Sequence, residues 1–170
     1  SAVSRGLGDV YKRQLYWLPK ELILFDNSKL RRNINVNLSD NSNLIFCETS
    51  IFGRKAMSEK IKNISFSDQW KIYSNSSIKH FEAINIKGST IDNFKNNYTF
   101  SNQSSLSTIL IFGDIVHQLE SVLRKVKKNL GNHYCEMTKF DDKIIIRCLA
   151  DDYYDLKKTF KDAIDNNSKI

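Results

Sequence analysis

Short strand patterns follow one another through the first half of the chain, and they constrain its fold more than any other feature. Between Leu15 and about Gly88, apolar residues alternate with polar ones or run together briefly, and turn-forming clusters such as Asn75-Ser76-Ser77 separate these stretches. This spacing predicts an all-β sandwich, barrel or β-solenoid. No internal sequence repeat selects among the three. The expected strands lie at residues 22–25, 30–38, 44–51, 55–66, 70–73 and 78–86.

The pattern changes after residues 89–105, a mostly polar stretch that predicts a subdomain boundary or an edge strand. Beyond it we expect a strand at 106–112 and a helix that Asp114 caps and Gly131 ends. A hairpin at 134–149 and a final helix follow. The order β-α-β-β-α predicts a small α+β layer. We therefore expect a β-sheet region at 15–105 and an α+β C-terminal subdomain at 106–170.

The stretch from Glu48 to Glu59 places charges where the strand pattern expects apolar residues. Glu48 and Glu59 each fall on an otherwise apolar face of a predicted strand, with the turn Gly53-Arg54 between them. A buried carboxylate needs a partner, and Arg54 is the nearest candidate for either one. Gly53 permits the backbone angles of a tight turn. One interpretation is an ion network that pins a hairpin; the other is a polar constellation lining an interface or an internal channel.

Two motifs, in this order, resemble a known family. The chain contains Trp17-Leu18-Pro19-Lys20-Glu21 with Ile23 and Phe25, and then a strand followed by Gly53-Arg54-Lys55-Ala56-Met57-Ser58-Glu59. Both are similar to segments of the urease accessory proteins called UreD (UreH in some species). Ser58 departs from the pattern, since the family usually has Gly there. The resemblance implies a mainly β fold of stacked antiparallel or β-helix-like sheets, with the β-α-β-β-α layer at the C-terminus.

Residues 1–14 do not look like an evolved part of a fold, because Ser4–Gln14 resembles a translated adapter used in making sequencing libraries. We expect this segment to be an artefactual leader, and its residues Ser1–Gly8 have little strand-forming pattern. The resemblance to UreD then covers the middle and C-terminal parts of the family's chain, which implies an N-terminal truncation.

Charge, hydropathy and cysteine count exclude several classes of function. The formal net charge is +7, but no run of five like charges occurs, so a nucleic-acid-binding arm is not indicated. An acidic protein partner suits the same charge. No apolar run exceeds four residues, which excludes a membrane-spanning helix. The odd number of cysteines, without paired spacing, argues against a disulfide framework and favours the cytoplasm.

The sequence carries no complete catalytic or metal-binding constellation. It lacks a nucleophile motif, a phosphate loop and a dinucleotide fingerprint. His133 and Cys135 would share one face of a strand and could supply two ligands that nickel accepts, but two ligands do not make a site. His80 and Glu82 form a similar pair, and His117 is expected on a helix face.

Three functions remain open. The resemblance implies a non-enzymatic scaffold that binds apo-urease and the accessory protein UreF, and through UreF the GTPase UreG. It would assist the delivery of nickel to urease. The chain would bind no permanent cofactor, and nickel would only pass through it. The channel or interface network would consist of Glu48, Gly53, Arg54 and Glu59. The alternatives are a β-rich hydrolase that uses Glu48 and Glu59 as an acid–base pair, and a carbohydrate-binding domain.

Overall fold

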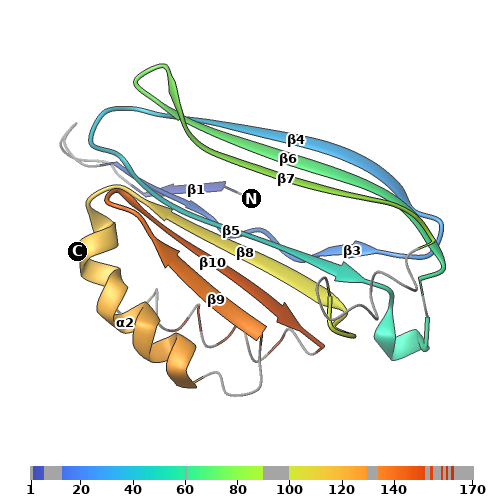
Figure 1. The fold of residues 1–170 in the computed structure, drawn as a ribbon. Coiled ribbons are helices and arrows are strands. Elements are labelled where there is room, and N and C mark those ends of the chain that lie inside the picture. Colours follow the sequence, from blue (N-terminus) through green and yellow to red (C-terminus); the bar gives the residue numbers. More distant parts are fainter. Residues whose placement is uncertain are drawn as a thin grey trace. The chain divides into compact units, whose positions relative to one another are not determined.

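The computed structural model describes residues 2–5, 13–59, 61–89, 100–129 and 134–151, together with residues 154, 158, 160 and 162. The chain is mainly β, as the strand patterns predict (Figure 1). It divides into two compact units, which are described separately below. The first contains residues 1–22, 41–50 and 103–170, and the second contains residues 23–40 and 51–102.

A seven-stranded sheet holds most of the first unit. Its order is β1-β2-β5-β8-β10-β9, and β3 pairs with β5 off this path. Strands β2 and β5 are parallel, whereas β1–β2, β8–β10 and β9–β10 are antiparallel. The strands are β1 (Ala2–Arg5), β2 (Gln14–Trp17), β3 (Leu22–Leu24), β5 (Asn43–Phe52), β8 (Ser105–Phe112), β9 (Tyr134–Lys139) and β10 (Lys143–Ala150).

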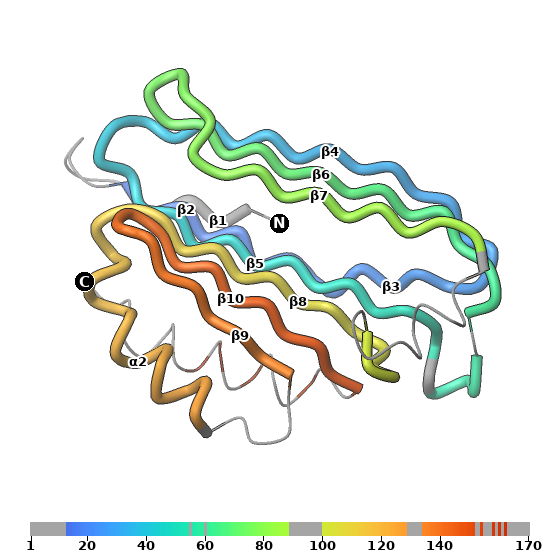
Figure 2. The backbone as a smooth tube through the Cα atoms, in the orientation of Figure 1, coloured from blue at the N-terminus to red at the C-terminus, as the bar shows by residue number. Residues whose placement is uncertain are grey.

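One amphipathic helix, α2 (Ile115–Asn129), packs on β8, β9 and β10, the strands beside which it lies in Figures 1 and 2. Its apolar residues recur at helical spacing, so Ile115, Leu119 and Leu123 form a single buried stripe. The predicted strand and helix are confirmed here. At the helix start, however, the backbone N–H of Ile115 donates to Oδ1 of Asn43 on β5, at 3.1 Å.

Gly113 makes this junction between β8 and α2 possible. Its φ is +98°, and a Cβ atom there would lie 2.5 Å from Oδ1 of Asn43 and 2.7 Å from the Ser42 carbonyl oxygen. Any side chain would therefore displace the acceptor that begins the helix.

The second unit contains a three-stranded sheet, β4-β6-β7, formed by β4 (Lys29–Leu38), β6 (Asn63–Ser74) and β7 (Ser77–Ser89) (Figure 2). Strands β4 and β6 are parallel, and β6 and β7 are antiparallel. Every second residue of β6, from Ile64 to Ser74, is buried, which is the period expected of one covered sheet face. Asn75 and Ser76, with φ of 51° and 58°, make the predicted turn.

The prediction of a hairpin around Gly53-Arg54 is wrong. Lys55–Met57 is a short 3-10 helix, β6 begins only at Asn63, and β5 and β6 belong to different sheets. The segment turns because Gly53 and Ser58 both adopt positive φ, 88° and 55°. The backbone N–H groups of Met57 and Glu59 donate to the Arg54 carbonyl, so hydrogen bonding is satisfied locally without a second strand. Only the last part of the strand predicted at 55–66 forms, and it belongs with the residues predicted at 70–73 to one strand, β6.

One further expectation changes at the start of the chain, and others concern residues that the structure does not describe. Residues 1–8 were expected to have little strand-forming pattern, yet Ala2–Arg5 pairs antiparallel with β2. The predicted final helix is described only at Tyr154, Lys158, Phe160 and Asp162, which are helical. Gly131, and residues 90–99 of the polar stretch, also lie outside the described residues. None of the described helices is both long and apolar enough to cross a membrane.

Candidate interaction site

Glu48 lies on β5 in the first unit, and Trp17 of β2 provides a hydrogen bond to it. The indole Nε1 donates to Oε1 of Glu48 at 2.6 Å, and the indole ring stacks on Phe46, with centroids 5.9 Å apart. Glu48 is 4% exposed. The hydrogen bond from the indole N–H to this buried carboxylate links the first sequence motif, which begins at Trp17, to β5, the strand that precedes Gly53.

Arg54 and Glu59, both in the second unit, form a bidentate ion pair. Nε of Arg54 lies 3.0 Å from Oε2 of Glu59, and Nη2 lies 3.0 Å from Oε1. The backbone N–H of Arg54 also donates to Oε2, at 3.0 Å. The sequence left Glu48 and Glu59 open as partners of Arg54, and the structure shows that the partner is Glu59. The side chains are 48% and 17% exposed, so this pair lies at the surface and not on a buried strand face.

The ion pair shifts the pKa of both groups in the direction that favours charge. The hydrogen bonds from the Arg54 side chain are the main cause of a Glu59 pKa below its ordinary value. The Glu59 carboxylate in turn raises the pKa of Arg54. Glu59 is therefore an ionised hydrogen-bond acceptor, which is the opposite of what a general acid requires.

Gly53 fits the turn for two reasons. Its φ of 88° favours glycine, and a Cβ atom would lie 3.1 Å from the Glu59 carbonyl oxygen. Its N–H donates to the carbonyl oxygen of Leu24 at 2.7 Å, which ties the turn to the end of β3.

The two sequence motifs meet at Phe25 and Arg54. The Arg54 guanidinium lies over the Phe25 ring, 5.3 Å from its centroid. Asp26, which follows Phe25 in the chain, accepts hydrogen bonds from the backbone N–H groups of Lys62 and Asn63, at 2.7 and 2.9 Å. These hydrogen bonds lower the pKa of Asp26, and the one from Asn63 has the largest effect. Sequence reasoning missed Asp26, although Asp26-Asn27-Ser28 is a turn-forming cluster that could have indicated it.

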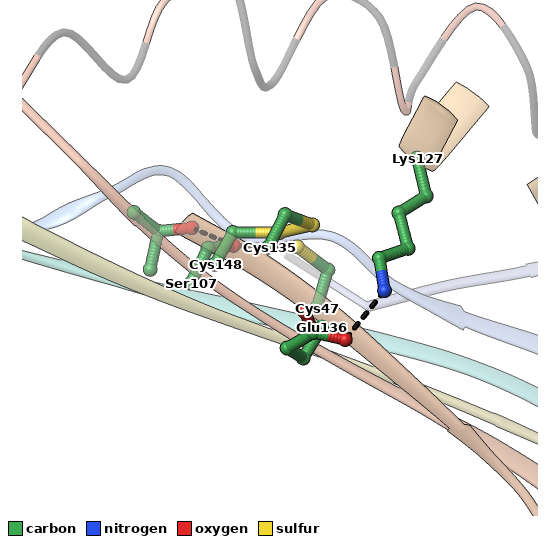
Figure 3. Close-up of a disulfide and its surroundings, with 7 residues drawn as sticks. Cys47, Ser107, Lys127, Cys135, Glu136 and Cys148 are labelled. Atoms are coloured by element: carbon green, nitrogen blue, oxygen red, sulfur yellow. Dashed lines mark hydrogen bonds and ion pairs between the residues drawn. A yellow bond between two sulfur atoms is a disulfide. The ribbon is translucent and has the colours of Figure 1, made fainter. Parts of the chain in front are cut away.

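The cysteines differ from the sequence expectation. A disulfide joins Cys135 of β9 to Cys148 of β10, which are directly opposed in the sheet register (Figure 3). Sγ of Cys47 lies 3.9 Å from Oγ of Ser107 on β8. Beside the disulfide, Lys127 of α2 pairs with Glu136 of β9. The argument against a disulfide framework from the odd cysteine count is therefore wrong for this pair.

The described residues contain no group of three or more His, Cys, Asp or Glu side chains that could hold a metal ion. His133 is not among the described residues, and the sulfur of Cys135 is in the disulfide rather than available as a thiolate. Nε2 of His80 lies 3.4 Å from Oε2 of Glu82, as their shared strand face predicts, and both are largely buried. His117 is exposed on α2, also as predicted.

Comparison with known proteins connects this geometry to a family. The chain is 30% identical to a urease accessory protein UreD of Rhizobium rhizogenes over 84% of its length and 51% of that protein's. It is 28% identical to urease accessory proteins UreD of Agrobacterium fabrum and of a Chelativorans species, over 85% and 87% of its length. The chain spans about half the length of these relatives. The family model of the UreD urease accessory protein matches residues 13–166, and the chain belongs to this family.

Proposed function

We propose that this chain acts as a non-enzymatic scaffold in urease maturation. It would bind apo-urease and UreF, reach the GTPase UreG through UreF, and assist delivery of nickel to the urease active site. The observation that carries the proposal is the family match across residues 13–166. The relatives are named urease accessory proteins, and an accessory role entails contact with the enzyme that is matured.

The chemistry of the two motif carboxylates supports a binding role over a hydrolytic one. Glu59 is ionised and engaged by Arg54 through two hydrogen bonds, so it has no proton to give at neutral pH. Glu48 accepts a hydrogen bond from the Trp17 indole. A hydrolase would need one carboxyl group with a raised pKa and a second poised to attack or activate water. The hydrolase and carbohydrate-binding alternatives have no comparable support.

We assign Gly53, Arg54 and Glu59 to an interface, because they build a rigid turn at the surface of the second unit. Glu48 is the candidate for a channel-lining carboxylate, since it is buried on β5 in the first unit and its Oε1 accepts the Trp17 indole N–H. Nickel would be cargo in transit and not a resident cofactor. We place this function in the cytoplasm, where the GTP that the proposed partner UreG hydrolyses is available.

A pull-down tests the proposed function. The tagged 170-residue chain would be co-expressed with UreF, apo-urease and UreG, singly and together. The proposal predicts that UreF and apo-urease are retained, and that UreG is retained only when UreF is present. Retention of none of the three would contradict it. Assays of the purified chain with urea, GTP and glycosides should show no turnover, and turnover that disappears in Glu59→Gln would favour the hydrolase instead.

A further inference from the structure

Three exposed side chains of the second unit gather around the turn at Gly53. Phe25 is 49% exposed, Arg54 is 48% exposed and Met57 is 68% exposed. Arg54 lies over Phe25, and Met57 follows three residues later in the 3-10 helix. We call these three residues the motif patch. Arg, Met and aromatic residues are the types enriched in the buried centres of protein interfaces.

The backbone beneath the motif patch is fixed before any partner arrives. The N–H of Met57 donates to the Arg54 carbonyl oxygen at 2.8 Å, and the N–H of Gly53 donates to the Leu24 carbonyl oxygen. Asp26 holds the two backbone N–H groups that lead into β6. Glu59 fixes the orientation of the guanidinium. A preorganised surface loses less conformational entropy on binding, which leaves more of the contact energy as affinity.

The charge that the motif patch shows to solvent is positive. Arg54 and Glu59 neutralise each other formally, but the guanidinium is 48% exposed while its carboxylate partner is only 17% exposed. A docking protein therefore meets a cation that lies over an aromatic ring, with the exposed Met57 three residues further along the same turn. The formal net charge of +7 over the whole chain adds attraction for an acidic partner.

We propose that the motif patch docks an acidic segment of a partner protein, one that presents a carboxylate between apolar side chains. The carboxylate would approach the exposed edge of the Arg54 guanidinium, and the apolar side chains would cover Phe25 and Met57. This inference rests on the proposed function, because the occupant belongs to one of the proteins that the chain binds in that role.

Two substitutions at one exposed position test the chemistry of the occupant. Met57→Glu and Met57→Lys both remove the apolar contact with side chains of similar length, but they add opposite charges. Neither touches the Arg54–Glu59 pair, and the high exposure of Met57 means that both variants should fold. Phe81 on β7 is 52% exposed in the same unit, so Phe81→Glu and Phe81→Lys are matched controls.

The dissociation constants of the 170-residue variants would be measured against purified UreF and against purified apo-urease. For at least one partner, Met57→Glu should weaken binding on the order of tenfold, and Met57→Lys should weaken it clearly less. Both Phe81 variants should bind like the wild type. Unchanged binding by Met57→Glu, or a larger loss in Met57→Lys, would overturn the inference while leaving the proposed function standing. A wild-type chain that binds neither protein would instead overturn the proposed function, and this inference with it.

Discussion

The guanidinium of Arg54 donates two parallel hydrogen bonds to the carboxylate of Glu59, and both residues are held within one turn of the chain. The sequence suggested a buried charge network, whose disruption would be very costly. The structure instead shows a pair on a surface turn, in which the Arg54 side chain is about half exposed and solvent screens the interaction. This relationship changes the expected result of several substitutions.

Arg54→Ala should lower the free energy of unfolding only slightly, because water can solvate Glu59 once its partner is lost. By contrast, Phe66→Ala removes a fully buried ring of β6 and should cost about 3–5 kcal/mol. Urea unfolding of the two variants beside the wild type measures the difference. An Arg54→Ala loss as large as that of Phe66→Ala would show that the ion pair is a core element after all.

Stability should fall in acid through Glu59 and Asp26. Both carboxyl groups have a folded-state pKa below the ordinary values of 4.5 and 3.8, so each stabilises the fold while ionised. Their contribution is full above those ordinary values and is lost as the pH falls through the lower folded-state pKa. Unfolding measured from about pH 6 down to about pH 2 should therefore show a shallower decline in Asp26→Asn and in Glu59→Gln than in the wild type. Parallel curves for all three proteins would contradict the assignment.

Ser58→Gly should stabilise the turn. Ser58 has a φ of 55°, a left-handed conformation that costs a residue with a Cβ atom about 1–2 kcal/mol. Glycine removes this cost but adds about 0.5–1 kcal/mol of unfolded-state entropy, so we expect a net gain of roughly 0.5–1 kcal/mol. The gain would appear as a higher urea midpoint with an unchanged slope. Gly53→Ala is the opposing control and should destabilise, because its Cβ atom would lie against the Glu59 carbonyl.

Glu48→Leu should destabilise the first unit by about 1–3 kcal/mol, because it removes the acceptor of the Trp17 indole N–H from a largely buried site. Glu48→Gln keeps a carbonyl oxygen at the same place and should cost less. Chemical unfolding followed by tryptophan fluorescence measures both. Equal losses in the two variants would mean that the hydrogen bond does not stabilise the fold.

The elements that the sequence predicted well are those with a clear period. The alternation in β4, the apolar run in β8 and the helical stripe of α2 each reflect one covered face, so the pattern of apolar residues in a short window was sufficient. Ser58 shows the limit of this reasoning. Its positive φ, which the apolar period cannot reveal, is what makes the residue at this position matter.

The contacts that the sequence did not predict are long-range ones. Asn43 begins α2 from a strand 72 residues away, and Trp17 reaches Glu48 across 31 residues. The Cys135–Cys148 disulfide depends on the register of β9 against β10, which residue spacing alone does not specify. Of the candidate site residues, the Arg54–Glu59 pairing could be foreseen as one of two options, whereas its exposure and its contact with Phe25 required the fold.

The most direct test of the account is the mass of the particle that the 170-residue chain forms with purified UreF. Size-exclusion chromatography with light scattering would be run on the chain, on UreF and on their mixture, and then with apo-urease added. We predict a mixed species whose mass contains both proteins, and a larger one that also contains apo-urease. If the chain and UreF elute with their separate masses, and apo-urease takes up neither of them, the proposed role in urease maturation is wrong for this chain.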